Sequence, residues 1–469
     1  MFNSTPGKLI GYECEKCMNR GYIYRVKADT TGLVFNMYLD ITSIDTGLKD
    51  VSFRYEFYKG TTKVKEGNFS DSYLTSNTVT CSKNNTNHIV LLTNESITTS
   101  NTNYTLYIWI DGANYVNPST MMGKEFSFKL HADGEGAVLV KTAAQTITEL
   151  YNTASKTTVT NNEITYNTAE SVSLMNDRLG GTTTSLDGGN IRYYGASPNN
   201  YIYFNCSDYS NQTSSTCETW RIIGVFNGKL KIIRNTSIGS YSWDNKNTST
   251  GAESAYGKND WTTARLMKLL NPSDYYTTDS NDNSLGQSLY YNSASGKCYS
   301  DQNNVTTNCD FTSTGIKNDT TRDLISEETW NIGGWNTDLV YSNQFYRYER
   351  GTTVYSGRPT TWTGKIGLMY PSDYGYAADL SKCTKRLGSY NDSTCTSNDW
   401  LFNSASQWTL APYSGYAYYA WGVYSAGGLL GNRAYDSSNG VRPALYLISD
   451  IALVSGGNGS STNPYQLAV

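Results

Sequence analysis

Residues 408–447 read WTLAPYSGYAYYAWGVYSAGGLLGNRAYDSSNGVRPALYL, and this stretch decides how the second half of the chain is interpreted. Tyrosine and tryptophan are interleaved in it with serine, glycine and alanine. Tyrosine offers a large rigid contact area at low entropic cost and a hydroxyl group, and serine and glycine adapt around it, as in antibody paratopes. The composition predicts a recognition surface, flanked by strands whose core residues are Trp408, Val441 and Leu445.

We expect the aromatic side chains and the polar groups beside them to bind a ligand, because tyrosine and tryptophan combine a large apolar face with a polar group. For Tyr416, Tyr418 and Tyr419, burial in a β-rich core is an alternative to ligand binding. Neighbouring residues in a strand, such as Tyr418 and Tyr419, face opposite sides, so one of them could point inward. For Arg433, a buried structural ion pair is an alternative to ligand contact. The predicted ligand-binding residues are Tyr413, Tyr416, Tyr418, Tyr419, Trp421, Tyr424, Asn432, Arg433, Tyr435 and Asp436.

The same stretch resembles the carboxy-terminal half of C-type-lectin-fold proteins of the sulfatase-modifying-factor type. It looks most like the variable ligand-binding domains that retroelements diversify in phages and bacteria, and it is similar to large secreted proteins of gut Firmicutes. The shared features are the strand that begins at Trp408, the aromatic stretch, Asn432-Arg433 and the closing GVRPAL at 440–445. With GNIRYYG at 189–195, the resemblance spans residues 191–469 approximately.

The resemblance implies a lectin-like fold with small sheets and long ordered loops. It does not imply sulfatase-modifying activity, because that chemistry uses a late pair of cysteines and no cysteine follows Cys395. Nor does it imply calcium-dependent sugar binding, because the E-P-N and W-N-D motifs are missing. The N-D-W triplets at 259–261 and 398–400 have a different order, and we assign them a structural role.

The amino-terminal part alternates apolar and polar residues with period two at 33–39, 51–58, 104–110 and 126–130. Such alternation indicates strands with one buried face, and several of them separated by turn residues favour a β-sandwich. The chain is therefore expected to be mostly β with an α+β carboxy-terminal domain. We predict an immunoglobulin-like sandwich at 1–135 that serves as a stalk, a short helix and polar linker at 136–190, and a C-type-lectin-like domain at 191–469.

Shorter elements are also predicted. Residues 142–151 form a helix with Ala144, Ile147 and Tyr151 on one face. Asn227-Gly228 between two apolar runs predicts a hairpin. Helices are expected at 262–270, capped by Asn259 or Asp260 and stopped by Asn271-Pro272, and at 322–330.

Six of the nine cysteines form local pairs that are 11, 11 and 12 positions apart and enclose polar sequence. Buried free thiols usually lie among apolar neighbours, so we predict disulfides of about 3 kcal/mol each and an oxidising compartment. The pairs are Cys206 with Cys217, Cys298 with Cys309, and Cys383 with Cys395.

The pairing of the remaining cysteines, Cys14, Cys17 and Cys81, is left open. The beginning, MFNSTPGKLIGYEC, has neither the charged start nor the apolar core of a signal peptide. We therefore expect a mature chain whose export signal or anchor has been removed. The expected location is extracellular or at the cell surface.

Charge and composition argue against several partners. The net charge is −4 and basic residues do not cluster, which argues against nucleic acid. No apolar run reaches 18 residues, so no membrane span is expected. Only His88 and His131 are present, which disfavours histidine metal centres and histidine-based triads. We expect no metal and no cofactor.

Function is therefore expected to be adhesin-like binding of an extracellular protein or glycan, without catalysis. One alternative is a structural subunit of a pilus or phage fibre, in which the tyrosines form the subunit interface. Another is an enzyme acting on polysaccharide, which would need two carboxylates in a cleft. No motif selects such a pair among Glu253, Asp260, Asp323, Glu327, Glu328, Asp373 and Asp379.

Overall fold

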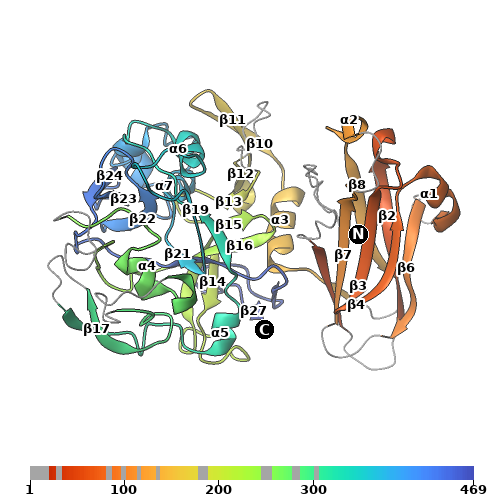
Figure 1. Cartoon of the computed structure of the whole chain (residues 1–469), viewed down its shortest axis with the longest axis horizontal. Coiled ribbons are helices and arrows are strands. Elements are labelled where there is room, and N and C mark those ends of the chain that lie inside the picture. The colour runs from red at the N-terminus through yellow and green to blue at the C-terminus, as the bar shows by residue number, and fades with distance from the viewer. Residues whose placement is uncertain are drawn as a thin grey trace. The chain divides into compact units, whose positions relative to one another are not determined.

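The computed structural model describes residues 21–27, 34–80, 87–96, 102–112, 118–133, 138–177, 189–244, 256–276, 286–299 and 306–469. The chain divides into two compact units, Met1–Thr142 and Ala143–Val469 (Figure 1). Antiparallel β-strands dominate both units, which confirms the mostly β class. Within the described ranges no helix has the length and apolar character needed to cross a membrane. Cys14, Cys17 and Cys81 lie outside these ranges.

Two sheets form the amino-terminal unit. One has the order β4 (Thr62–Asn68), β3 (Phe53–Lys59), β7 (Thr102–Ile110), β1 (Gly21–Lys27) and β9 (Val138–Val140). The other has the order β5 (Thr78–Thr80), β6 (Asn87–Ser96), β2 (Val34–Ile44) and β8 (Phe126–Asp133). Short helices join the strands: η1 (Thr46–Leu48), α1 (Asp71–Asn77) and α2 (Pro118–Met121).

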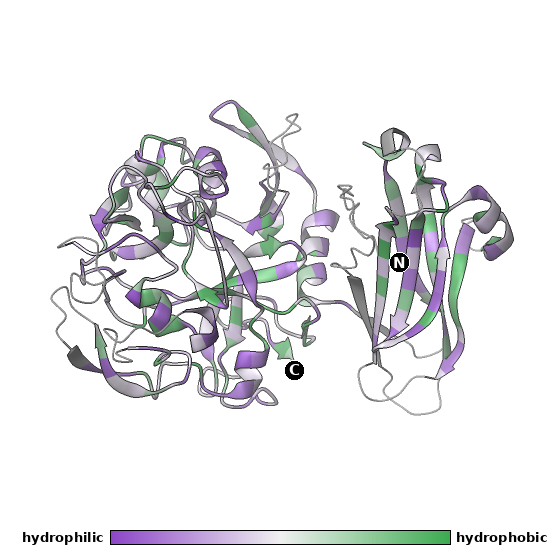
Figure 2. Ribbon diagram, in the orientation of Figure 1, coloured by the Kyte–Doolittle hydropathy of each residue, from purple (hydrophilic) through white to green (hydrophobic). Residues whose placement is uncertain are grey.

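The two sheets share one apolar core, and the predicted alternation explains it. In β2, Phe35, Met37 and Leu39 are buried, whereas Asn36 and Tyr38 between them are partly exposed. Figure 2 shows the resulting alternation of hydrophobic and hydrophilic residues along these strands. The strands predicted from period two at 33–39, 51–58, 104–110 and 126–130 correspond to β2, β3, β7 and β8, and are confirmed.

The only two histidines of the chain meet in this unit. His88 on β6 and His131 on β8 lie on either side of the buried Asp40 of β2. Their Nδ1 atoms are 3.2 and 3.7 Å from the two Asp40 carboxylate oxygens. Both histidines therefore belong to the amino-terminal unit.

A large antiparallel sheet organises the carboxy-terminal unit. Its strand order is β10 (Thr157–Asn161), β11 (Ile164–Ala169), β12 (Leu174–Asn176), β13 (Ile191–Tyr193), β15 (Glu218–Phe226), β16 (Lys229–Arg234), β25 (Ala444–Tyr446) and β21 (Ile366–Gly367), with β14 (Tyr201–Phe204) also paired to β15. Because β16 pairs with β25, the sheet joins the beginning of the unit to its end.

Smaller elements surround this sheet. The strand pairs are β17 (Ser295–Tyr299) with β18 (Thr306–Asp310), β19 (Glu328–Asn331) with β20 (Thr361–Gly364), and β26 (Ala452–Leu453) with β27 (Leu467–Ala468). The helices are α3 (Ala143–Thr153), η2 (Glu170–Val172), α4 (Arg265–Leu270), η4 (Ser273–Tyr275), α5 (Asp319–Asp323), α6 (Ser342–Glu349), α7 (Pro371–Ala377), η5 (Leu387–Ser389) and α8 (Ser393–Thr396).

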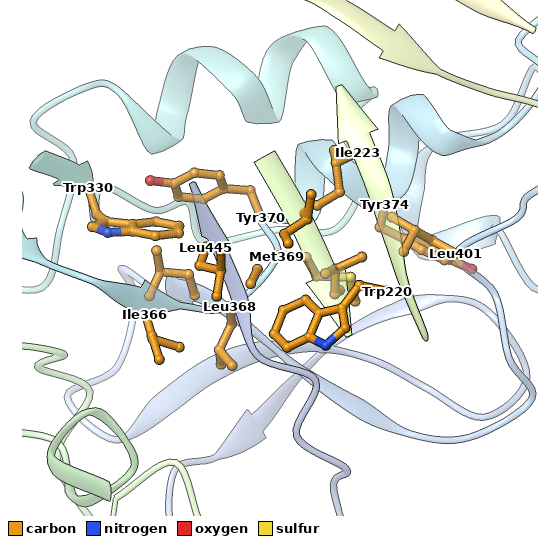
Figure 3. Packing of buried hydrophobic residues seen from close by; sticks show 14 of the residues in the cluster. Trp220, Ile223, Trp330, Ile366, Leu368, Met369, Tyr370, Tyr374, Leu401 and Leu445 are labelled. Carbon is orange, nitrogen blue, oxygen red and sulfur yellow. The ribbon is translucent and has the colours of Figure 1, made fainter. Parts of the chain in front are cut away.

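Indole rings fill much of the core around the sheet. Trp220 from β15 and Trp330 from β19 are at most 1% exposed, and they lie among aliphatic side chains such as Leu445 of β25 (Figure 3). Trp408, Val441 and Leu445 are at most 1% exposed, so their predicted place in the core is confirmed. Full burial of such large side chains favours one arrangement of the elements.

In the range 136–190, the expected short helix is present as α3, whereas part of the stretch expected to be a polar linker forms the strands β10 to β12 of the large sheet. The predicted helix face is confirmed, because Ala144, Ile147 and Tyr151 of α3 are buried. The threonine- and asparagine-rich strands were hard to recognise because few of their residues are apolar. Tyr166 and Leu174 are nevertheless at most 2% exposed, and this burial holds the segment against the unit.

The Asn-Gly hairpin is confirmed as β15 and β16, with Asn227 and Gly228 at φ of 50° and 76°. Two helix predictions need correction. The helix expected at 262–270 begins only at Arg265, because Asp260 accepts from the Thr262 amide and closes a turn instead. At 322–330, α5 ends at Asp323 and β19 follows, because Trp330 pairs with Trp362 across two strands.

The structure joins the six locally paired cysteines as the spacing predicted. Disulfides connect Cys206 to Cys217, Cys298 to Cys309 and Cys383 to Cys395. The loop between Cys383 and Cys395 also places Leu387 and Tyr390 in the apolar core. Disulfides of this kind are typical of proteins from oxidising compartments.

Candidate functional site

The predicted recognition stretch folds into a three-stranded sheet, with β22 (Gln407–Pro412), β23 (Tyr419–Val423) and β24 (Leu429–Arg433) in that order. Six tyrosines gather at the end of this sheet where β23 begins and β24 ends. We call them the tyrosine cluster: Tyr256, Tyr413, Tyr416, Tyr418, Tyr419 and Tyr435.

The rings of the cluster form a connected set. Tyr416 contacts Tyr413, Tyr418 and Tyr419 at centroid distances of 5.9, 5.9 and 5.4 Å. Tyr256, from a segment far earlier in the chain, extends the set with distances of 5.0 Å to Tyr418 and 5.6 Å to Tyr435. Such distances are typical of favourable aromatic pairs, so the rings support one another.

The cluster is open to solvent. Tyr416 is 51% exposed, and the other cluster members that the sequence predicted are partly exposed. Tyr418 and Tyr419 were expected to face opposite sides if both lay in a strand. Their rings are instead 5.1 Å apart, because β23 begins only at Tyr419 and the alternation does not include Tyr418.

Asn259 holds the backbone beneath the cluster. Its side-chain nitrogen lies 2.8–2.9 Å from the carbonyl oxygens of Tyr413, Tyr416 and Tyr419. Its side-chain oxygen accepts from Arg358 Nε at 3.1 Å, and Arg358 also donates to the Ala417 carbonyl. The turn that presents the tyrosines is therefore fixed before any ligand arrives, which lowers the entropy lost on binding.

Trp421 was predicted to bind ligand, but it is only 1% exposed. Its indole lies below Tyr413 at 4.9 Å, and its Nε1 donates to the Trp335 carbonyl at 3.1 Å. Gly431 lies opposite Trp421 on β24 and leaves room for the Tyr413 ring, because a Cβ there would be 2.9 Å from that ring. Trp421 therefore supports the cluster from beneath.

The remaining predicted residues lie at its edge or apart from it. Tyr424 is 50% exposed but follows the far end of β23. Asn432 pairs with Ala420 and, by strand alternation, points to the other face from Arg433. Asp436 lies in the turn after β24 and accepts from the backbone and hydroxyl of Ser438.

Arg433 is exposed, and the buried ion pair that the sequence left open does not form. It faces Tyr419 across the strand pair. Its guanidinium lies 4.4 Å from the Tyr256 ring centroid, and Nη1 donates to the Tyr435 hydroxyl at 3.3 Å. The hydrogen bonds to the hydroxyls of Tyr435 and Tyr419 raise the pKa of Arg433, so it stays charged.

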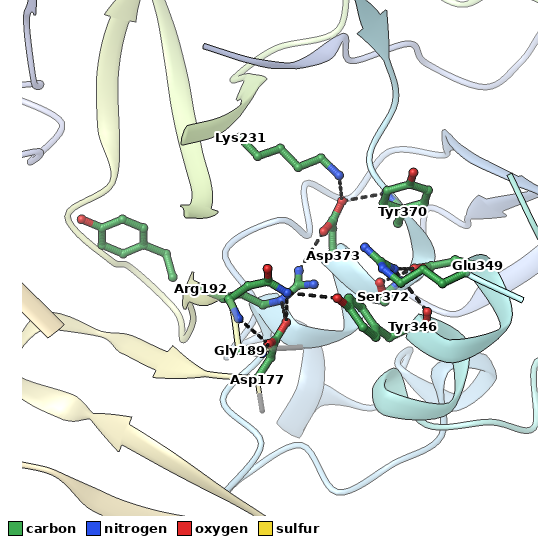
Figure 4. A network of polar contacts seen from close by, with 12 residues as sticks. Asp177, Gly189, Arg192, Lys231, Tyr346, Glu349, Tyr370, Ser372 and Asp373 are labelled. Atoms are coloured by element: carbon green, nitrogen blue, oxygen red, sulfur yellow. Dashed lines mark hydrogen bonds and ion pairs between the residues drawn. The ribbon is translucent and has the colours of Figure 1, made fainter. Parts of the chain in front are cut away.

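A second group of polar residues, which the sequence did not reveal, lies in the core (Figure 4). Asp373, in the first turn of α7, pairs with Arg192 of β13 at 2.8 Å and with Lys231 of β16 at 2.5 Å. Arg192 also pairs with Asp177 at 2.5 Å. All four side chains are at most 1% exposed. We call these four residues the ion network.

The ion network connects the large sheet to α7. One Asp373 oxygen also accepts from the Tyr370 amide at 2.9 Å, which caps the helix. Burial alone would raise the pKa of Asp373, but Lys231 and Arg192 outweigh it and lower the pKa to about 2. Its carboxylate is buried and pairs with both cations and the Tyr370 amide, which indicates a structural role for the network.

Two further carboxyl groups are buried with raised pKa values. Burial raises the pKa of Glu349 to about 7, although Arg350 and Ser372 oppose the shift. Burial raises the pKa of Asp399 to about 8, against opposing hydrogen bonds from the amides of Leu401 and Phe402. Both groups therefore keep a proton in the folded state at pH values where the unfolded chain has lost it.

We expect the stability of the carboxy-terminal unit to fall as the pH rises from about 5 to about 7. A folded-state pKa above the unfolded value means that the native state binds more protons in this window, so raising the pH favours unfolding. Each such group contributes about 1.4 kcal/mol per pH unit. Urea unfolding at pH 5, 6 and 7 measures the slope, and Asp399→Asn is expected to remove about half of it. A flat profile, or an unchanged slope in the variant, would contradict this assignment.

Nothing in the sequence pointed to Tyr256 or Arg358, and Asn259 was predicted only as a candidate helix cap. The N-D-W triplet at 259–261 indicated a structural role for Asn259, but no local pattern relates it to the carbonyl groups of the tyrosine-bearing turn. Tyr256 and Arg358 have no local pattern that relates them to the tyrosines. They reach the cluster only through the tertiary fold.

Comparison with known proteins finds a match to a family model. The model of a family described as "Domain of unknown function (DUF6273)" matches residues 372–449. This range includes Asp373, Asp399 and the sheet that carries the tyrosine cluster. No curated protein and no solved structure matches the chain.

Proposed function

We propose that this chain is a secreted or surface-displayed binding protein with an adhesin-like role. Its carboxy-terminal unit binds an extracellular ligand, a glycan or a protein, through the tyrosine cluster and Arg433. In this proposal the carboxy-terminal unit has a C-type-lectin-like fold, and the amino-terminal unit is an immunoglobulin-like stalk.

One observation carries the proposal: a solvent-exposed set of touching tyrosine rings rests on a backbone that Asn259 holds in place. Exposed aromatic groups of this kind are uncommon on surfaces without partners, and rigid tyrosines are frequent at binding sites. Their flat apolar faces fit the C–H faces of sugars, and their hydroxyls offer hydrogen bonds. The disulfides support an extracellular location.

The two exposed tyrosines Tyr416 and Tyr424 permit a matched test, because they are 51% and 50% exposed and only Tyr416 lies in the cluster. A glycan array and a cell-binding assay would compare the wild type with Tyr416→Ala/Tyr418→Ala and with Tyr424→Ala. We expect the double variant to bind at least about tenfold more weakly, or about 1.4 kcal/mol, and Tyr424→Ala to bind as the wild type does.

Equal binding by the wild type and the double variant would refute the assigned face. Light scattering at micromolar concentration provides the second readout. Self-assembly of the wild type that disappears in the double variant would instead support a subunit of a pilus or fibre.

A further inference from the structure

The tyrosine cluster carries a positive charge at its edge. Arg433 lies at the end of β24, where Tyr435 and Tyr256 contact its guanidinium. These contacts orient the group, yet the face of Tyr256 and the hydroxyls of Tyr435 and Tyr419 leave part of its hydrogen-bonding capacity unused. A guanidinium has five N–H donors in a fixed planar fork.

No carboxylate in the described part of the chain forms an ion pair with Arg433. The nearest acidic residue in sequence, Asp436, uses Oδ1 to accept from the Ser438 amide at 2.8 Å and from its hydroxyl at 2.6 Å. By contrast, the buried Arg192 and the partly buried Arg234 are paired with carboxylates. Among the described residues, Arg433 therefore presents a charge without a carboxylate partner, at the edge of rings suited to sugar binding.

We propose that the tyrosine cluster selects acidic saccharides, and that Arg433 binds the carboxylate of a uronic or similar acidic sugar. This inference rests on the proposed function of the cluster. The planar fork of arginine matches a carboxylate through two parallel hydrogen bonds, whereas the tyrosine rings contact the sugar ring beside it. Tyr256 and Tyr435 hold the fork in place, which reduces the entropy lost when the carboxylate binds.

The test uses the full chain and an array of uronic-acid oligosaccharides in two forms, the free acid and the methyl ester. The ester keeps the sugar but removes the negative charge. We expect the wild type to bind the acid about 10- to 100-fold more tightly than the ester, the range typical of charged hydrogen bonds. Arg433→Gln is expected to remove this preference, because it weakens binding of the acid and leaves binding of the ester unchanged. Arg433→Lys is expected to restore part of the preference, because lysine keeps the charge but lacks the planar fork.

The outcomes separate this inference from the proposed function. Equal binding of acid and ester by the wild type, or an unchanged ratio in Arg433→Gln, overturns the acidic preference. If binding in that case is still lost in Tyr416→Ala/Tyr418→Ala, the cluster remains a binding site for other ligands. Binding of sulfated oligosaccharides or acidic peptides in preference to the uronic acids also overturns the inference.

Discussion

Replacing Asp373 by asparagine is expected to destabilise the carboxy-terminal unit by about 3–5 kcal/mol. The substitution keeps the shape of the side chain and removes its charge. Of the carboxylate partners that the described residues supply, Lys231 then loses Asp373 and Arg192 keeps Asp177. A buried charge without a partner is strongly unfavourable because its hydration is not replaced. Urea unfolding followed by tryptophan fluorescence would measure the change.

Asp319→Asn provides the matched control, because the Asp319 side chain is 93% exposed and its pair with Arg322 is at the surface. We expect its effect to stay within about 0.5 kcal/mol. Combining Asp373→Asn with Lys231→Met is expected to recover part of the loss, since Arg192 and Asp177 then remain as a balanced pair. A loss below 1 kcal/mol in Asp373→Asn would show that the ion network does not hold α7 to the sheet.

The second large effect is expected for Trp421→Ala, at about 3–5 kcal/mol. The indole is 1% exposed and contacts both Tyr413 and Phe345, so its removal leaves a cavity beneath the cluster. Ligand binding should fall as well, although Trp421 reaches no ligand, because Tyr413 loses its support.

Trp421→Phe separates these two roles. Phenylalanine retains most of the ring packing but cannot donate to the Trp335 carbonyl. We expect an intermediate loss of stability and nearly unchanged binding. A stable Trp421→Ala protein with impaired binding alone would indicate that Trp421 contacts the ligand directly, as its position in the sequence had predicted.

The sequence predicted local features well. Period-two alternation located the strands of the amino-terminal unit, Asn227-Gly228 located a hairpin, and cysteine spacing located the disulfides. In each case the signal and its structural consequence lie within a few residues of each other. The helix expected at 322–330 was wrong because a long-range strand pairing of Trp330 outweighed local preference.

The candidate site was predictable only in part. The composition of 413–436 indicated exposed tyrosines, and most of them lie together. Burial of Trp421 depends on Trp335 and Phe345, which the sequence does not relate to it. The ion network brings together Asp177, Arg192, Lys231 and Asp373, which span almost 200 positions of the sequence. No local sequence pattern therefore predicts it.

Asn259 contacts the tyrosine-bearing turn only through main-chain oxygens. Every amino acid supplies the same carbonyl group, so this attachment is indifferent to which side chains the turn displays. Residues at positions such as 416 can therefore be exchanged while the loop keeps its path. The unit therefore fixes the position of the turn at which a ligand would bind. The side chains that the turn displays can differ between related proteins without a change in that position.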